Sequence, residues 1–232
     1  MSIILAIETS SELASATLLR DGVVTSAEAA GVVTHSQSIL PMVQSLLADA
    51  GIKLADCDAI AFGSGPGSFT GVRTACGIAQ GLAYGSNLPV VPIVTLLALA
   101  QACHDKTGAR DVLAVLDARM GEVYWAQYKF DQTWQIVVPP TLSAPVDVVP
   151  IGEVVACGNG LNAYAAEFSL RAFFSDELKD WVPHAVHIAH LGAIAFAQGL
   201  GLPVMAAEPL YLRNKIALTT NERLEKAAKA AA

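Results

Sequence analysis

The sequence predicts an α/β fold made of two lobes, and a repeated strand pattern is the main observation behind that prediction. The apolar run of residues 112–115 repeats that of residues 4–7 about 108 positions later. Each run is followed by a polar turn and an alternating strand. Duplication of a strand–strand–strand–helix–strand–helix unit accounts for this pattern. A single lobe remains open, because the repeat is short and rests mainly on the strand openings.

The first lobe is predicted over residues 1–104. Strands are expected at 3–8, 13–20, 23–28, 58–63 and 90–94, and helices at 35–50, at 68–84 and from Thr95 onward. Asp21-Gly22 is a hairpin signal between the second and third strands. Proline is tolerated only near the first turn of a helix, so Pro41 places the start of the first helix at Ser36 or Ser38. We expect Thr95 to cap the third helix.

The second lobe is predicted over residues 105–221, with a frayed or disordered tail at 222–232. Strands are expected at 112–115, 122–130, 134–138 and 154–157, and helices at 161–168 and 188–198. Pro139-Pro140 should break the third of these strands. Alternation in the second strand predicts one face formed by Tyr124, Ala126, Tyr128 and Phe130 and another formed by Val123 and Trp125.

Composition excludes some functions. The 232 residues are 53% hydrophobic, but no apolar run reaches the roughly 18 residues of a membrane helix. The net charge of −7 opposes direct binding of a phosphate backbone, so any RNA should be held by another protein. The N-terminus is expected to be a strand rather than a signal peptide. The four cysteines form no C-x-x-C pair, which favours free thiols in a reducing cytoplasm.

The glycine-rich segment 63–73 is the most informative motif. Its glycines permit close backbone approach, and Ser68 or Thr70 can cap the helix that follows. Exposed amides at that helix start suit an anion. The segment has neither the Lys-Ser/Thr pair of a Walker A loop nor the spacing of a dinucleotide fingerprint. A tight strand-to-helix connection is therefore the alternative interpretation.

Two further polar groupings have a structural interpretation beside a chemical one. Asp117 and Glu122 could form an acid/base pair, but a β-hairpin with a polar turn at residues 118–121 is favoured. His184, His187 and His190 form H-x-x-H-x-x-H. On a helix the third ring faces away from the first, and no carboxylate or cysteine is close in sequence, so a metal site is not predicted there.

Gly77, Gly81 and Gly85 recur at four-residue spacing in the second helix. Each glycine costs a helix about 1 kcal/mol relative to alanine, so their repetition indicates close approach by another backbone. Packing within the lobe would explain it. A helix–helix interface with another subunit is the functional alternative.

Ordered motifs resemble those of the TsaB (YeaZ) family. They are Leu5-Ala6-Ile7-Glu8-Thr9-Ser10, His35-Ser36 with Leu40-Pro41, the glycine-rich segment, Asp117 to Tyr124, and Pro209-Leu210-Tyr211-Leu212-Arg213. The motif positions singled out are Glu8, His35, Gly65, Gly67, Ser68, Thr70, Arg73, Asp117, Arg119, Glu122, Tyr211 and Arg213. Glu8 stands where the family usually carries Asp. The related catalytic TsaD proteins carry His-x-x-x-His on the first helix, whereas here His35 is followed four residues later by Ile39.

This resemblance implies an actin-like (ASKHA) duplicated two-lobe fold and a cytoplasmic, non-catalytic role. The chain is expected to support TsaD in transferring threonylcarbamoyl from threonylcarbamoyl-AMP to N6 of adenosine 37 in tRNAs that read codons beginning with A. TsaE, an ATPase, is a further expected partner, and a homodimer is expected when the chain is alone. This chain would contact tRNA only indirectly, through the complex with its partner proteins. ATP and metal are expected in the partner proteins and no cofactor in this chain.

Partner contact is expected through the first two helices. The residues predicted at or beside that surface are Leu40, Val43, Leu47, Arg73, Cys76 and Gln80. An active actin-like ATPase or transferase is the alternative function, and a peptidase is the least favoured.

Overall fold

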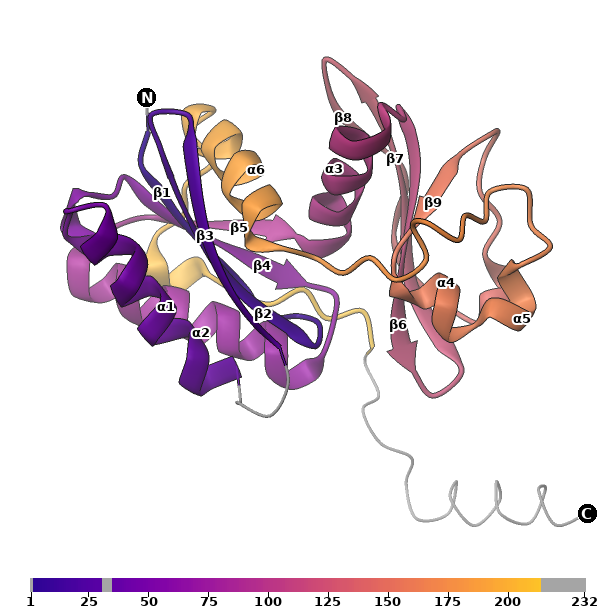
Figure 1. The fold of residues 1–232 in the computed structure, drawn as a ribbon, viewed down its shortest axis with the longest axis horizontal. Helices are drawn as coiled ribbons and strands as arrows, with labels where there is room; N and C mark the ends of the chain where they lie inside the picture. Colours follow the sequence, from indigo (N-terminus) through magenta and orange to yellow (C-terminus); the bar gives the residue numbers. More distant parts are fainter. Residues whose placement is uncertain (1, 31–34, 214–232) are drawn as a thin grey trace, which may run out of the picture.

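A computed structural model describes residues 2–30 and 35–213 and contains two mixed β-sheets flanked by helices (Figure 1). The predicted tail lies outside the described residues. The first sheet has the strand order β3-β2-β1-β4-β5 and the second β8-β7-β6-β9. In each, three antiparallel strands are joined by a parallel strand beside the first of them. This shared order agrees with the duplication predicted from the strand openings.

The first sheet is buried on both faces at its centre. Its strands are β1 (Ile4–Glu8), β2 (Leu13–Arg20), β3 (Val23–Ala30), β4 (Ala59–Gly65) and β5 (Val90–Val94). Every residue of β1 and β4 is buried, as expected for parallel strands with helices on both sides.

Three helices cover the two faces of the first sheet. α1 (His35–Asp49) and α2 (Phe69–Ser86) lie side by side on one face. α6 (Ala185–Ala197) lies on the opposite face (Figure 1). Residues 185–197 therefore pack on the sheet of the first lobe, although the sequence assigns them to 105–221. That predicted boundary remains a prediction.

The second sheet also has helices on both faces. Its strands are β6 (Asp111–Arg119), β7 (Glu122–Asp131), β8 (Thr133–Ser143) and β9 (Val155–Cys157). α3 (Thr95–Thr107) packs on one face with Tyr124 and Tyr128. α4 (Asn159–Ala163) and α5 (Ala165–Phe168) pack on the other with Val123 and Trp125. The predicted alternation of β7 is confirmed for these four residues.

The helix predicted at 35–50 is observed, but its inferred start at Ser36 or Ser38 and the predicted cap at Thr95 are wrong. α1 already includes His35, so Pro41 lies in its interior. The helix continues past this missing hydrogen bond because Ile39, Val43 and Leu46 are anchored in the core. Thr95 is the first residue of α3 rather than its cap, because its hydroxyl is occupied elsewhere.

Three predictions in the second lobe also need correction. β8 continues through Pro139-Pro140, because they lie where its pairing with β7 shifts register at one edge of the sheet. The helix predicted at 161–168 is divided at Tyr164, whose extended φ of −127° ends α4. Only a short 3₁₀ turn (Pro145–Asp147) stands between β8 and β9, where the repeat predicts a helix.

No helix among the described residues is long and apolar enough to span a bilayer.

Candidate functional site

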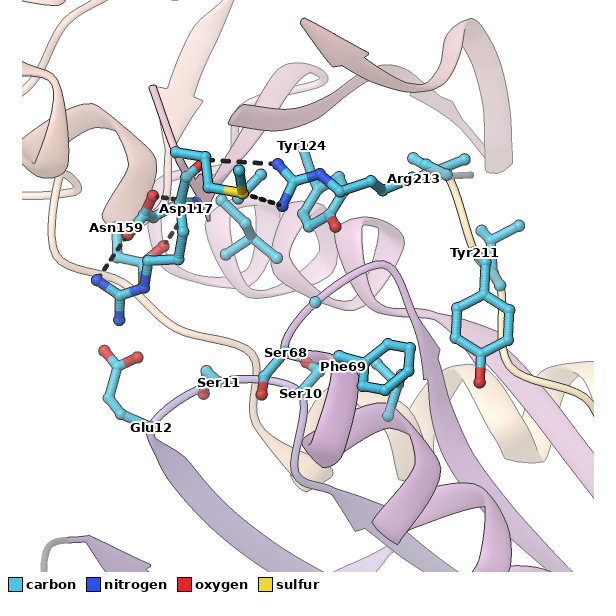
Figure 2. A pocket seen from close by; sticks show the side chains of 18 of the residues that line it. Ser10, Ser11, Glu12, Ser68, Phe69, Asp117, Tyr124, Asn159, Tyr211 and Arg213 are labelled. Carbon is cyan, nitrogen blue, oxygen red and sulfur yellow. Dashed lines mark hydrogen bonds and ion pairs between the residues drawn. The ribbon is translucent and has the colours of Figure 1, made fainter. Parts of the chain in front are cut away.

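A cleft of about 450 Å³ opens between the two sheets (Figure 2). Glu12, Ser11 and Ser68 border it from the first lobe, and Asp117 and Asn159 face them from the second (Figure 2). Residues 210–213, which we call the C-terminal segment, close one side of the cleft. The cleft includes seven of the predicted motif positions: His35, Gly67, Ser68, Asp117, Arg119, Tyr211 and Arg213.

The loop glycines allow the chain to pack tightly against itself. A Cβ at Gly71 would lie 1.9 Å from the Thr9 carbonyl oxygen, and one at Gly67 would lie 2.6 Å from Ser10. A Cβ at Gly63 would lie 1.9 Å from a carboxylate oxygen of Glu8. The turn after β1 thus occupies the space that these glycines leave open. The interpretation of the motif as a tight strand-to-helix connection explains them.

Three backbone amides of the glycine-rich segment are engaged within the protein. The Gly65 amide donates to the Thr95 hydroxyl at 3.1 Å, and the Ser68 amide donates to the Ser10 carbonyl at 2.7 Å. The Gly71 amide donates to the Ser68 hydroxyl at 3.4 Å, so of the two predicted candidates, Ser68 and Thr70, Ser68 is the cap of α2. Three donors that could otherwise meet a phosphate already have protein acceptors.

Glu8 is fully buried beneath this loop and does not line the cleft. Its carboxylate accepts from the Ser10 amide at 2.6 Å and from the Thr95 hydroxyl at 3.4 Å. Burial raises the pKa of Glu8 above the usual value, and these hydrogen bonds only partly oppose the rise. A carboxyl enclosed in this way is poorly placed to hold a metal or orient a phosphate.

Asp117 and Glu122 flank a β-hairpin whose Met120 and Gly121 both have positive φ, 61° and 84°. Asp117 accepts from the Arg119 amide at 2.7 Å and pairs with the Arg119 guanidinium at 2.9 Å. Glu122 pairs with Arg213. Each carboxylate therefore has its own arginine. The hairpin interpretation is supported over an acid/base pair.

Arg213 connects the C-terminal segment to the hairpin. It donates to the Arg119 carbonyl at 3.4 Å as well as to Glu122. Upstream, the Leu210 amide donates to the Ser64 carbonyl at 2.7 Å. A Cβ at Gly65, where φ is +104°, would lie 3.0 Å from the Leu210 oxygen. The segment therefore bridges the glycine-rich loop and the second lobe.

The contacts of the cleft serines and of His35 do not form a nucleophile–base pair among the described residues. The buried Ser10 hydroxyl has no hydrogen-bond partner there, and the Ser68 hydroxyl caps α2. The ring of His35 approaches the Glu12 carbonyl at 3.4 Å. Nucleophilic catalysis requires a base within hydrogen-bonding reach of the nucleophile, so these contacts do not favour it.

The six predicted interface residues separate into exposed and buried groups. Leu40 and Arg73 are exposed, and Leu47 is partly buried. Val43 and Cys76 have only 2% and 4% of their surface exposed and belong to the core beneath α1 and α2. The amide of the sixth residue, Gln80, donates to the Ala207 carbonyl at 3.0 Å. That these residues form a partner surface remains a prediction.

Arg73 and its neighbours form an exposed aromatic cluster next to the cleft. Its guanidinium carbon lies 3.2 Å from the ring centroid of Phe69 and 5.1 Å from that of Tyr211. Stacking of this kind holds the guanidinium in one orientation while leaving it accessible. Thr70, another predicted motif position, is exposed in the first turn of α2.

The outer face of α2 is open to solvent along its glycines. Gly77, Gly81 and Gly85 are exposed, and a Cβ added at any of them would meet no heavy atom within 4 Å. Tyr84, beside them, is 77% exposed. Packing within the lobe does not explain these glycines. We call this surface, formed by Gly77, Gly81, Gly85 and Tyr84, the glycine face.

Sequence reasoning missed three residues that organise the cleft. Asn159 accepts from the Asp117 amide at 3.1 Å, and Tyr164 donates to the Asp117 carboxylate at 3.2 Å. Thr95 links Gly65 to Glu8. They come from distant parts of the chain, so no local pattern could have grouped them.

Comparison with known proteins gives consistent results for sequence and structure. The family model for TsaD, tRNA N6-adenosine threonylcarbamoyltransferase, matches residues 27–175. A protein of Escherichia coli K12 named tRNA threonylcarbamoyladenosine biosynthesis protein TsaB is 41% identical over 221 residues, covering 92% of this chain and 96% of the relative. A protein of the same name from Haemophilus influenzae is 36% identical and covers 92% and 94%.

Two solved structures from Pseudomonas aeruginosa share the fold. A structure of YeaZ has a TM-score of 0.82 and 38% identity, covering 91% of this chain and all of that one. Another, described as an uncharacterized protein with similarity to peptidase YEAZ, has a TM-score of 0.86 and 38% identity, covering 92% of this chain and all of that one. These similarities confirm the predicted two-lobe α/β fold class.

Proposed function

We propose that this chain, which belongs to the TsaB family, is a non-catalytic partner of TsaD in forming threonylcarbamoyladenosine on tRNA. Its closely similar relatives are named as biosynthesis proteins of this modification. TsaD would transfer threonylcarbamoyl from threonylcarbamoyl-AMP to N6 of adenosine 37, in tRNAs that read codons beginning with A. TsaE would regulate the complex, which acts in the cytoplasm.

The observation that carries this proposal is the glycine face of α2. A helix that keeps three glycines in open solvent sacrifices stability without any gain in the isolated chain. A partner helix can approach such a surface closely enough for backbone-to-backbone contact, which larger side chains would prevent. Leu40 on α1 and Tyr84 on α2 supply exposed apolar surface. TsaD is the proposed occupant in the complex, and a second copy is the proposed occupant when the chain is alone.

The interior of the cleft supports the non-catalytic part of the proposal. Glu8 is enclosed, three loop amides have protein acceptors, and both hairpin carboxylates are paired with arginines. We therefore propose that this chain holds no ATP or metal for the transfer reaction, and that TsaD and TsaE hold them. The net charge of −7 is consistent with tRNA being bound through the complex.

An actin-like ATPase is the second candidate, and the cleft itself is the observation in its favour. Its volume of about 450 Å³ lies in the usual range for small-molecule sites. A nucleotide phosphate that bound the amides of Gly65, Ser68 or Gly71 would have to displace their present hydrogen bonds. Peptidase activity has weaker support, because the Ser68 hydroxyl caps α2 and the Ser10 hydroxyl is buried without a well-oriented hydrogen-bond partner among the described residues.

The two candidates are separated by co-purification with the TsaD homologue of the same organism. We expect a defined heterodimer by light scattering and no heat of ATP binding when calorimetry is performed on this chain alone. ATP binding by this chain at micromolar concentrations, without a complex, would instead support the ATPase.

A further inference from the structure

The contact between α3 and α6 gathers three potential metal ligands outside the cleft. They are Asp105 near the end of α3 and His187 and His190 on α6. A carboxylate oxygen and two imidazole nitrogens from these residues all lie within 4.8 Å of one another. The two helices face each other between the sheets in Figure 1.

The geometry of His187 is the sharpest feature of this group. Its Nδ1 lies 3.3 Å from Asp105 Oδ2, within ion-pair distance. The same nitrogen is inaccessible to water and has no properly oriented hydrogen-bond partner among the described residues. An imidazole nitrogen and a carboxylate oxygen that face each other at this distance are both donors that one cation could bind.

Spacing on the helix places the second imidazole correctly. His187 and His190 are three residues apart on α6, so their side chains share one face. Zinc is commonly bound by histidine nitrogens and carboxylate oxygens, at about 2.0–2.2 Å, with a fourth position open to water. The donor atoms lie within 4.8 Å of one another, so the side chains would move closer together when an ion binds.

His184 does not belong to this group, although the sequence pattern includes it. It caps α6, and its Nδ1 accepts from the Val186 amide at 3.1 Å. Its Nε2 lies 3.2 Å from a carboxylate oxygen of Glu28. The third donor is therefore Asp105, which lies far upstream in the sequence.

We propose that Asp105, His187 and His190 bind one divalent ion of the zinc type. The ion joins α3, which packs on the second sheet, to α6, which packs on the first. The bound ion would therefore cross-link the two lobes, on the face of the first sheet opposite α2 and its glycine face. The role is structural, because the group lies outside the residues that line the cleft.

Calorimetric titration of the metal-stripped chain with zinc chloride tests this proposal. We expect one zinc per chain, and Asp105→Asn and His190→Gln should each weaken binding by at least about tenfold. His35→Gln is the matched control, because it removes an imidazole outside the group and should leave the affinity within about twofold. The four cysteines are buried, so they should not compete for the ion.

Thermal unfolding provides a second measurement on the same proteins. Saturating zinc should raise the midpoint of the wild type and of His35→Gln, and should leave the Asp105→Asn/His190→Gln double variant unchanged. Circular dichroism without zinc establishes that each variant is folded. Absence of zinc binding by the folded wild type at millimolar concentrations would overturn the proposal, as would undiminished binding by the folded double variant.

Discussion

The glycines of the glycine-rich segment 63–73 and the glycines on the outer face of α2 are close in sequence but have opposite surroundings. Gly67 and Gly71 leave no room for a side chain, because the turn after β1 packs against them. Gly77 and Gly81 have open space where a side chain would be. Gly67 and Gly71 allow close packing within the chain, whereas Gly77 and Gly81 leave an exposed surface on α2. The glycine-rich segment, which is the more prominent motif in the sequence, therefore has a structural role. The proposed function depends on the glycine face.

Among the changes that test this contrast, Gly71→Ala is expected to have the largest effect on the free energy of unfolding. Its Cβ would overlap the Thr9 carbonyl, which is backbone and cannot move aside easily. We expect the free energy of unfolding to fall by about 3 kcal/mol or more, measured by urea denaturation. Gly77→Ala is the matched control, and it should raise the free energy of unfolding by up to about 1 kcal/mol. Equal effects of the two changes would contradict the contrast.

The next effect concerns the enclosed carboxyl of Glu8. Burial raises its pKa in the folded chain above the usual value of about 4.5, so the folded state retains a proton that the unfolded state releases. The free energy of unfolding should therefore fall as the pH rises above about 4.5, by at most about 1.4 kcal/mol per pH unit, until the folded-state pKa is reached.

Glu8→Gln should remove this contribution while keeping the acceptor for the Ser10 amide. Urea denaturation of both proteins from about pH 4 to pH 8 measures it, and the stability of the variant relative to the wild type should increase with pH. If the stabilities of the wild type and of Glu8→Gln changed in parallel with pH, Glu8 would have a normal pKa, which would contradict its enclosure beneath the loop.

A smaller effect is expected at the hairpin that borders the cleft. The Arg213 side chain is 18% exposed and Glu122 is 39% exposed, so solvent partly screens their ion pair. A double-mutant cycle with Glu122→Gln and Arg213→Gln should give a coupling of about 0.5–1 kcal/mol in the free energy of unfolding. A coupling near zero would mean that the C-terminal segment is held by its backbone contacts instead.

Local patterns predicted most of the fold, because alternation and turn residues depend on neighbours in sequence. The two faces of β7 were predicted this way and are observed, and Ser68 is one of the two residues predicted to cap α2. Long-range packing could not be predicted. The Thr95 hydroxyl bonds with Gly65 and Glu8 instead of capping α3. Helix α6, although it comes late in the sequence, packs on the first sheet.

The same limit applies to the sites. Seven residues of the cleft had been singled out as motif positions through the family resemblance, but whether their hydrogen-bond donors are free depends on contacts across the chain. Val43 shares the helical spacing of the predicted interface, yet the structure places it in the core. Asp105 could be joined to His187 and His190 only after α3 and α6 were placed side by side.

The most direct test of the central claim measures how tightly the TsaD homologue binds variants of the glycine face. Gly81→Leu adds bulk at an exposed position of α2, and Ala197→Leu adds similar bulk at an exposed position of α6 on the opposite side of the sheet. We predict that Gly81→Leu remains folded and weakens binding by at least about 30-fold, while Ala197→Leu matches the wild type. Wild-type affinity for folded Gly81→Leu would contradict the assignment of this face to the partner.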